Sequence, residues 1–212
     1  MLRKKIKASA IQNLTDARYF AAWEVEWLSF NLEEGSETYI APGNMKAMRE
    51  WVDGVQIVGE FPTRNSLEVV EWAKLLDLTW LQVGVNAALE VLQDYQIIQE
   101  HIITPLTDFE ELRMRLATCQ GQVQYFQLDF ERDGLSWENL DENARIKRTH
   151  LQQICQEFPV ILSIGFKPEN LEALSDYLAY QALNLQGGDE EKVGFKSYDD
   201  LDEILEQLEV EI

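Results

Sequence analysis

The regular alternation of apolar strand segments with helical segments is the feature of this sequence that most restricts its fold. Short apolar runs of strand length recur at even intervals along 212 residues, and helix-start signals separate them. The eight predicted strands are Lys5–Ala10, Val25–Phe30, Val55–Gly59, Trp80–Val83, Ile97–Ile103, Val123–Asp129, Val160–Ile164 and Ala182–Leu185. Because strands that alternate with helices pair in parallel, the pattern predicts repeated βαβ units.

Helix-start signals lie between these strands. Asn13 is a predicted N-cap. Pro42 and Pro168 suit a first helical position. Thr107 and Ser197 each precede an acidic residue by three positions, which is the spacing of a capping box. The predicted helices are Asn13–Ala22, Pro42–Trp51, Thr63–Leu76, Ala87–Gln93, Thr107–Cys119, Asn143–Phe158, a helix from Pro168, and Tyr198–Leu208.

Two architectures contain repeated βαβ units, a closed barrel and an open doubly wound sheet. Eight units of about 25 residues suit a compact barrel near the lower size limit of that fold. The first strand is not followed by the glycine pattern G-x-G-x-x-G of a dinucleotide-binding sheet. The sequence therefore predicts an α/β fold, a single-domain (β/α)8 TIM barrel over residues 1–212. Its tryptophans Trp23, Trp27, Trp51, Trp72 and Trp80 are predicted to pack between barrel and helices.

Charge and cysteine content restrict the partners and the compartment. The net charge is −20, from 18 basic and 38 acidic side chains, which argues against a nucleic-acid partner. The same charge disfavours an anionic ligand unless the pocket is locally positive. The chain contains no apolar run of membrane-span length, and its basic first residues are not followed by a signal-peptide core, so we expect no membrane association. Cys119 and Cys155 are interpreted as reduced thiols of a cytoplasmic protein.

Two glycine turns follow the last two predicted strands. Gly165 follows the seventh strand, and Gly187 with Gly188 follows the eighth. Glycine allows close backbone approach and a helix N-terminus favours negative charge, so these glycines are predicted to bind a phosphate. The alternative is that they simply end turns and helices. His101 and His150 lack partners at metal-ligand spacing, so no metal site is predicted.

Several segments resemble motifs of the phosphoribosylanthranilate isomerase family, in the family's order and over nearly the whole chain. Residues 7–17, KASAIQNLTDA, resemble its opening motif K-I-C-G-I-T-N-x-x-D-A. Residues 162–170 resemble L-x-G-G-L-x-P-E-N, and residues 184–190 resemble D-V-S-S-G-V-E. Residues 36–42 and 81–83 resemble S-x-R-x-v-x-P and the start of V-Q-L-H.

The resemblance implies a barrel that performs a cofactor-free Amadori rearrangement in tryptophan biosynthesis, converting a phosphorylated aminoaldose to an aminoketose. It implies an aspartate at the end of the sixth strand as general acid, which matches Asp129, and the cysteine of K-I-C-G-I as general base, which matches Ser9. From the residues alone, Asp129 is equally an exposed carboxylate that starts a turn, and Asp133 competes for its role.

The sequence departs from the family pattern at several site positions. An unactivated Ser9 hydroxyl is a poor base. Thr38 and Gly84 stand where the family has an arginine and a histidine, and residues 133–137 shorten a glycine-rich loop. Two hypotheses follow: an isomerase with weak or altered activity, or a non-catalytic relative that binds a phosphorylated metabolite or a protein partner. A monomer and a homodimer are both compatible with the sequence.

Overall fold

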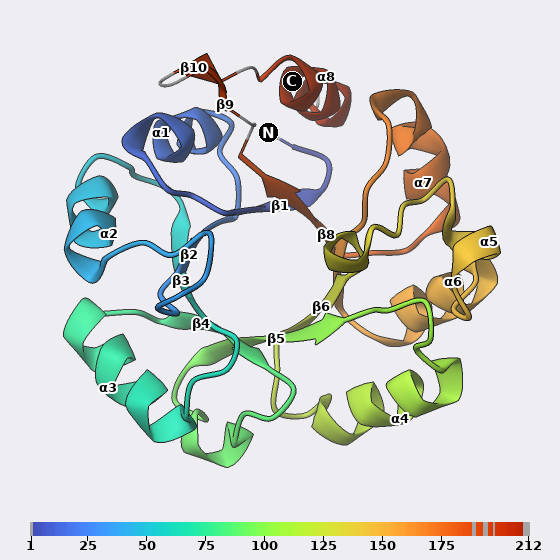
Figure 1. Ribbon diagram of the computed structural model, residues 1–212, viewed down its shortest axis with the longest axis horizontal. Helices are drawn as coiled ribbons and strands as arrows, with labels where there is room; N and C mark the ends of the chain where they lie inside the picture. Colours follow the sequence, from blue (N-terminus) through green and yellow to red (C-terminus); the bar gives the residue numbers. More distant parts are fainter. Residues whose placement is uncertain (1, 188–189, 193–194, 197, 210–212) are drawn as a thin grey trace.

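The strands of the computed structural model, which describes residues 2–187, 190–192, 195–196 and 198–209, close into a parallel barrel (Figure 1). In chain order they are β1 (Lys5–Ser9), β2 (Trp27–Asn31), β3 (Gln56–Phe61), β4 (Trp80–Gly84), β5 (Gln96–Ile102), β6 (Tyr125–Asp129), β7 (Val160–Ser163) and β8 (Ala182–Gln186). Strand β1 pairs with both β2 and β8, so this sheet closes on itself. The predicted (β/α)8 barrel is confirmed, and the doubly wound alternative is excluded.

Helices form a ring around this barrel in Figure 1. The helices are α1 (Leu14–Ala22), α2 (Pro42–Arg49), α3 (Ser66–Leu76), α4 (Phe109–Cys119), α5 (Leu140–Asn143), α6 (Arg148–Glu157), α7 (Leu171–Tyr177) and α8 (Asp199–Leu208). Short 3-10 turns are η1 (Leu89–Val91), η2 (Glu131–Asp133) and η3 (Pro168–Asn170), and β9 (Glu190–Lys192) pairs antiparallel with β10 (Phe195–Lys196). The 3-10 turn η1 replaces the short helix predicted over Ala87–Gln93.

Side-chain capping explains where the helices begin. Asn13 caps α1 as predicted, since its side chain accepts a hydrogen bond from the Asp16 N–H. Asn65 caps α3, which therefore begins three residues later than predicted. Asp108 caps α4 in place of the predicted Thr107, whose hydroxyl oxygen instead accepts the Thr104 N–H at 2.9 Å. The predicted capping residue Ser197 lies outside the described residues.

The helix predicted over Asn143–Phe158 is divided in the structure. Residues between α5 and α6 leave the helical conformation because Ala144 is extended and the Arg145 N–H donates to the Pro105 carbonyl at 3.0 Å. This hydrogen bond ties the segment to the loop after β5. A tertiary contact thus ends a helix that the local sequence would continue.

Alternate residues of each strand face the inside of the barrel. At the amino-terminal end, Trp27 packs edge-on against Trp80 and Tyr125, in a cluster separate from the layer between barrel and helices. The prediction for Trp27 and Trp80 was wrong, because strand periodicity turns these side chains inward. The prediction for Trp51 was also wrong, since that side chain is 68% exposed. Towards the other end of the barrel the inward-facing residues become polar.

Candidate active site at the carboxyl end of the barrel

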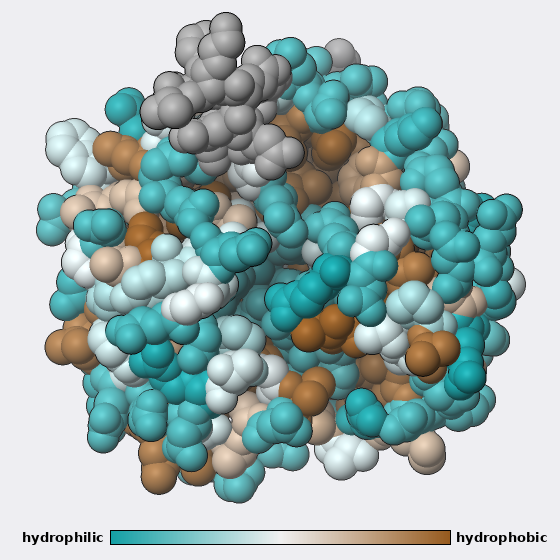
Figure 2. Space-filling model, in the orientation of Figure 1, coloured by the Kyte–Doolittle hydropathy of each residue, from teal (hydrophilic) through white to brown (hydrophobic). Residues whose placement is uncertain are grey.

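The carboxyl ends of the strands surround a polar cavity of about 610 Å³ over the barrel centre. Figure 2 shows a hollow near the middle of this face, bordered mainly by hydrophilic residues. The described lining of the central cavity consists of Ser9, Ala10, Asn31, Ser36, Glu37, Thr38, Glu60, Pro62, Gln82, Glu100, Gln127, Asp129, Glu131, Arg132, Ser163, Asn184 and Gln186. Every strand of the barrel, or the turn after it, therefore contributes to one site.

Ser9 lies in this cavity as the acceptor of a hydrogen bond. The Asn184 amide donates to the Ser9 hydroxyl at 3.0 Å and to the Ser163 hydroxyl at 3.1 Å. The Asn184 carbonyl oxygen in turn accepts from the Lys7 ammonium at 3.1 Å. Lys7 also forms a buried ion pair with Glu60 at 2.8 Å. The amide orientation of Asn184 is thus determined by Lys7, and it directs a donor at the position of the predicted base.

Asp129 lies in the same cavity and receives donors at both carboxylate oxygens. Its Oδ1 accepts the backbone N–H groups of Glu131 at 3.1 Å and Arg132 at 3.2 Å. Its Oδ2 lies 3.4 Å from Arg132 Nε. Asp129 therefore stands at the end of β6, with its orientation held by the turn η2. The structure brings Asp129 and Ser9 together, whereas Asp133 is not among the described residues of the lining.

The histidines lie away from Ser9. His101 points from the outer face of β5, and its Nε2 atom lies 3.1 Å from the side-chain Oε1 of Gln99. Burial, with a further contribution from Arg115, lowers the pKa of His101 to about 4. His150 lies in the first turn of α6, where it stacks on Phe109. Neither histidine is positioned to take a proton from the Ser9 hydroxyl.

Glu100 is a site residue that the sequence analysis missed. Its Oε1 accepts from the Gln82 amide at 3.3 Å and lies 3.6 Å from the Arg132 guanidinium. Burial and then the neighbouring Glu60 raise the pKa of Glu100 to about 7, against the smaller opposing effect of Arg132. A carboxyl group with a pKa near neutrality can both donate and accept a proton. The sequence offered little indication of this role. A single glutamate in a predicted strand does not show whether its side chain faces the inside of the barrel or which residues surround it.

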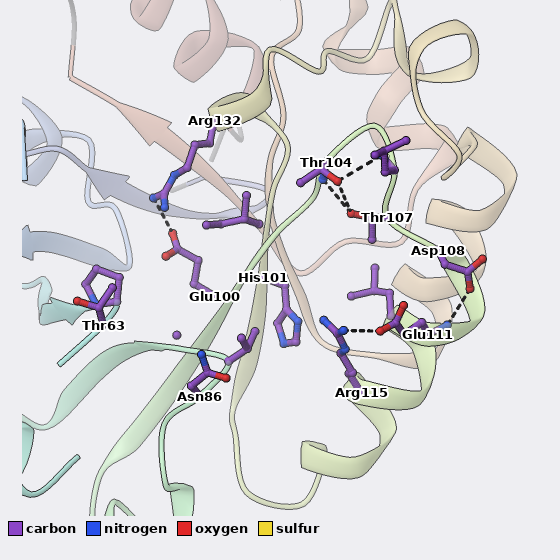
Figure 3. A pocket seen from close by; sticks show the side chains of 16 residues that line it. Thr63, Asn86, Glu100, His101, Thr104, Thr107, Asp108, Glu111, Arg115 and Arg132 are labelled. Carbon is purple, nitrogen blue, oxygen red and sulfur yellow. Dashed lines mark hydrogen bonds and ion pairs between the residues drawn. The ribbon is translucent and has the colours of Figure 1, made fainter. Parts of the chain in front are cut away.

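Glu100 and Arg132 connect the central cavity to a second one beside β4 and β5 (Figure 3). In Figure 3, Arg132 reaches down to Glu100, while His101 and Arg115 lie on the α4 side. Exposed apolar side chains on this side are Val85, Ile102 and Leu106. The two cavities therefore differ, one being polar and acidic and the other partly apolar.

Two of the predicted phosphate-binding glycines, Gly165 and Gly187, are not among the described residues that line the central cavity. The Gly165 carbonyl accepts the Trp137 N–H at 2.7 Å, so the turn after β7 is joined to the loop after η2. A Cβ on Gly187 would lie 3.1 Å from the buried Asp16 carboxylate, which explains the glycine without a ligand. Gly188 lies outside the described residues. Phosphate binding by these three glycines stays a prediction.

Gly84 occupies the position of a histidine in the family motif, and only glycine fits there. A Cβ at this position would clash with the backbone carbonyl oxygen of Pro62. We expect Gly84→Ala to destabilise the protein by about 1–3 kcal/mol, because the loop after β3 must move. Urea unfolding measures this change. Gly121→Ala, where the Cβ would enter open space, is the matched control, and equal effects of the two substitutions would contradict the explanation.

No group of three or more His, Cys, Asp or Glu side chains in the described part of the chain is arranged to hold a metal ion. None of the helices described is long and apolar enough to cross a membrane. Cys119 and Cys155 are free thiols, and burial raises the pKa of Cys155 to about 12.

Comparison with known proteins agrees with the fold. No family model matches the chain. An N-(5'-phosphoribosyl)anthranilate isomerase of Parabacteroides distasonis is 26% identical over 212 residues, covering 96% of this chain and 92% of that protein.

Solved structures give the same result. The phosphoribosyl anthranilate isomerase of Thermus thermophilus has a TM-score of 0.72 and 26% identity, covering 96% of this chain and 98% of its own. An isomerase crystallised with reduced 1-(o-carboxyphenylamino)-1-deoxyribulose 5-phosphate has a TM-score of 0.71 and 18% identity, covering 96% and 97%, and supports the fold alone. The chain is thus similar over nearly its whole length to phosphoribosylanthranilate isomerases, and Ser9 stands where the motif of that family has a cysteine.

Proposed function

We propose that this chain is a phosphoribosylanthranilate isomerase-like protein of tryptophan biosynthesis with weak or altered activity. The named relatives support the reaction class, and one observation supports the change in activity. Ser9, at the position of the family base, accepts a hydrogen bond from Asn184. A hydroxyl held in this way keeps its own proton and is a poor acceptor for a proton from carbon.

The proposed reaction opens a sugar ring, moves a proton from C2 and delivers a proton to C1. Asp129 is the proposed general acid for the ring oxygen, and Ser9 occupies the place of the base that removes the C2 proton. Both side chains are 7% exposed at the edge of one cavity, which suits two groups that act on one substrate. With Ser9 as base, removal of the C2 proton has a higher barrier than protonation of the ring oxygen.

A non-catalytic relative is the second candidate. Its support is that carboxylates of the protein lie where the fold would offer donors to a phosphate. Glu131 Oε2 accepts from Gln186 at 3.1 Å and from Ser163 at 3.4 Å, at the ends of β8 and β7. Thr38, at the place of the family arginine, accepts from Asn31 and brings no positive charge.

Ser9→Cys separates the two candidates. A thiol ionises near pH 8.5, far closer to neutrality than a hydroxyl, and the Asn184 donor would stabilise its thiolate. We expect the substitution to raise isomerase turnover by at least about tenfold, and Asp129→Asn in the same background to remove the gain. Turnover is followed by the loss of phosphoribosylanthranilate fluorescence, alongside growth of a strain lacking the isomerase.

Ser175→Cys, on α7 and outside the cavity, controls for the added thiol. Soluble, folded Ser9→Cys protein that shows no gain over the wild type would argue against the isomerase and for the non-catalytic relative.

A further inference from the structure

The second cavity, of about 460 Å³, borders the central cavity at the end of β5 (Figure 3). The two cavities share Pro62, Glu100 and Arg132 in their described linings. The volume of the second cavity lies in the range of pockets that hold small organic ligands. A ligand held over the barrel centre can therefore extend into the second cavity at this border.

The second cavity presents exposed apolar side chains to a ligand. Val85 is 44% exposed, Ile102 43% and Leu106 71%, and all three belong to its described lining. In the central cavity, the apolar residues of the described lining are Ala10 and Pro62. Covering apolar surface with an apolar group is favourable because it removes both surfaces from water. The second cavity therefore suits the aromatic part of a ligand, and the central cavity suits the polar part.

Arg132 lies at the border of the two cavities with donors to spare. Its Nε lies 3.4 Å from Asp129 and its Nη2 lies 3.6 Å from Glu100, and both distances exceed those of close charge-assisted hydrogen bonds. The side chain is 51% exposed. A guanidinium has five N–H donors, and their planar arrangement matches the two oxygens of a carboxylate. Arg132 can therefore bind a carboxylate of a ligand while it stays near Asp129 and Glu100.

Other side chains near the two cavities are less suited to bind a carboxylate. Arg115 lies on α4, where it is paired with Glu111, and it does not belong to the described lining of the central cavity. Burial lowers the pKa of His101 to about 4, so this ring is neutral at pH 7. Thr38, at the place of the family arginine, brings no positive charge. Among the described lining residues, Arg132 is thus the cation that reaches both cavities.

The barrel places this border opposite the turns at which the phosphate is predicted to bind. Strand β4 lies four strands from β8 around the closed barrel, and β5 lies four strands from β1. A substrate of the proposed function with its phosphate after β7 and β8 therefore has its ribose over the barrel centre and its aromatic amine towards β4 and β5. The carboxylate of that substrate is ortho to the amine, so it is close to the bond that joins the ring to the sugar. It consequently lies at the border, within reach of Arg132.

We infer that the second cavity binds the aromatic ring of the substrate and that the Arg132 guanidinium binds the carboxylate of this ring. The inference rests on the proposed function and deepens it, because it names the residue that selects a carboxylated ring. The positive charge that the family motif has in the turn after β2, at the place of Thr38, is supplied here from η2 after β6. Arg132 acts in binding and transfers no proton.

Isothermal titration calorimetry of the full chain at pH 7 tests the role of Arg132 with two probes that do not react. Reduced 1-(o-carboxyphenylamino)-1-deoxyribulose 5-phosphate carries the ring, the carboxylate and the phosphate, and its phenylamino counterpart lacks only the carboxylate. We expect the wild type to bind the carboxylated probe at least about tenfold more tightly than its counterpart. In Arg132→Gln the two affinities should agree within about twofold. Arg18→Gln, which changes an exposed arginine of α1, should keep the tenfold preference.

A second substitution tests the position of the ring. We expect Leu106→Ser to weaken the binding of both probes by about fivefold and to keep the preference for the carboxylate, because it removes apolar surface and no charge. Leu75→Ser, at a side chain 62% exposed on α3 and outside both cavities, is the matched control and should leave both affinities unchanged. Equal affinities in these two variants would place the ring elsewhere and overturn the inference.

Failure of this inference and failure of the proposed function give different results. If the folded wild type binds both probes equally well, or if Arg132→Gln keeps the tenfold preference, the inference is wrong and the proposed function is not affected. If the folded wild type binds neither probe, both are wrong. Turnover plays no part in these titrations, so a slow proton transfer at Ser9 does not influence them.

Discussion

Replacing Lys7 by methionine is expected to destabilise the barrel by about 3–5 kcal/mol, because it leaves the Glu60 carboxylate without its partner. The Lys7 side chain is fully buried, its ammonium lies 2.8 Å from Glu60, and it also donates to Asn184. Neither water nor salt screens such a pair as it screens a surface pair. Urea unfolding monitored by tryptophan fluorescence measures the loss, and the melting temperature should fall by about 2–4 °C for each kcal/mol.

The same loss should be largely recovered when both charges are removed together. Lys7→Met combined with Glu60→Leu replaces the ion pair by apolar groups, which proteins often tolerate without loss of stability. Lys46→Met, on the exposed face of α2, is the matched single control and should change stability by less than about 0.5 kcal/mol. If Lys7→Met lowers the free energy of unfolding no more than this control does, the ion pair between Lys7 and Glu60 does not stabilise the protein to the extent expected.

Glu100→Gln is expected to stabilise the protein at pH 8 and to have little effect near pH 5. The pKa of Glu100 is raised from its usual 4.5 to about 7, mainly by burial and by Glu60. Between pH 4.5 and pH 7, Glu100 holds a proton in the folded state that it has released in the unfolded state. Stability therefore falls as the pH rises from about 4.5 to about 7, by about 3 kcal/mol in total. Glutamine does not ionise and escapes this loss.

Unfolding free energies at pH 5 and pH 8 reveal the effect as a difference between variants. The gap between Glu100→Gln and the wild type should widen by about 3 kcal/mol across this range. Glu90→Gln, an exposed carboxylate on η1, provides the control and should follow the wild type at both values. A constant gap would mean that Glu100 is already ionised at pH 5 in the folded protein.

These two substitutions affect opposite ends of one buried charge network. Lys7 on β1 stabilises Glu60 on β3, and Glu60 in turn raises the pKa of Glu100 on β5. Removing Lys7 while Glu60 stays ionised should therefore raise the pKa of Glu100 further. The double substitution of Lys7 and Glu60 should lower it. The network links the stability of the barrel to the protonation of its candidate site.

The order of the elements was predictable because it depends on local patterns. Eight apolar runs separated by helix signals lead to a closed parallel barrel, and Asn13 caps α1 as its residue type indicated. Residue identity was also enough to predict that Ser9 is a poor base. These properties belong to short segments, so no knowledge of distant neighbours was needed.

Only the tertiary structure decided which side chains share the cavity and what surrounds them. Trp27 and Trp80 lie inside the barrel rather than behind it, since a shift of one residue along a strand reverses the direction of every side chain. Glu100 acquires its pKa from burial and from Glu60, a residue that is 40 positions away in the sequence and lies two strands away in the barrel. The Glu131 carboxylate meets the Gln186 amide of β8, and the Glu138 carboxylate meets the Lys167 N–H after β7, only once the barrel has closed, because hydrogen bonds depend on distance in space and not on position along the chain.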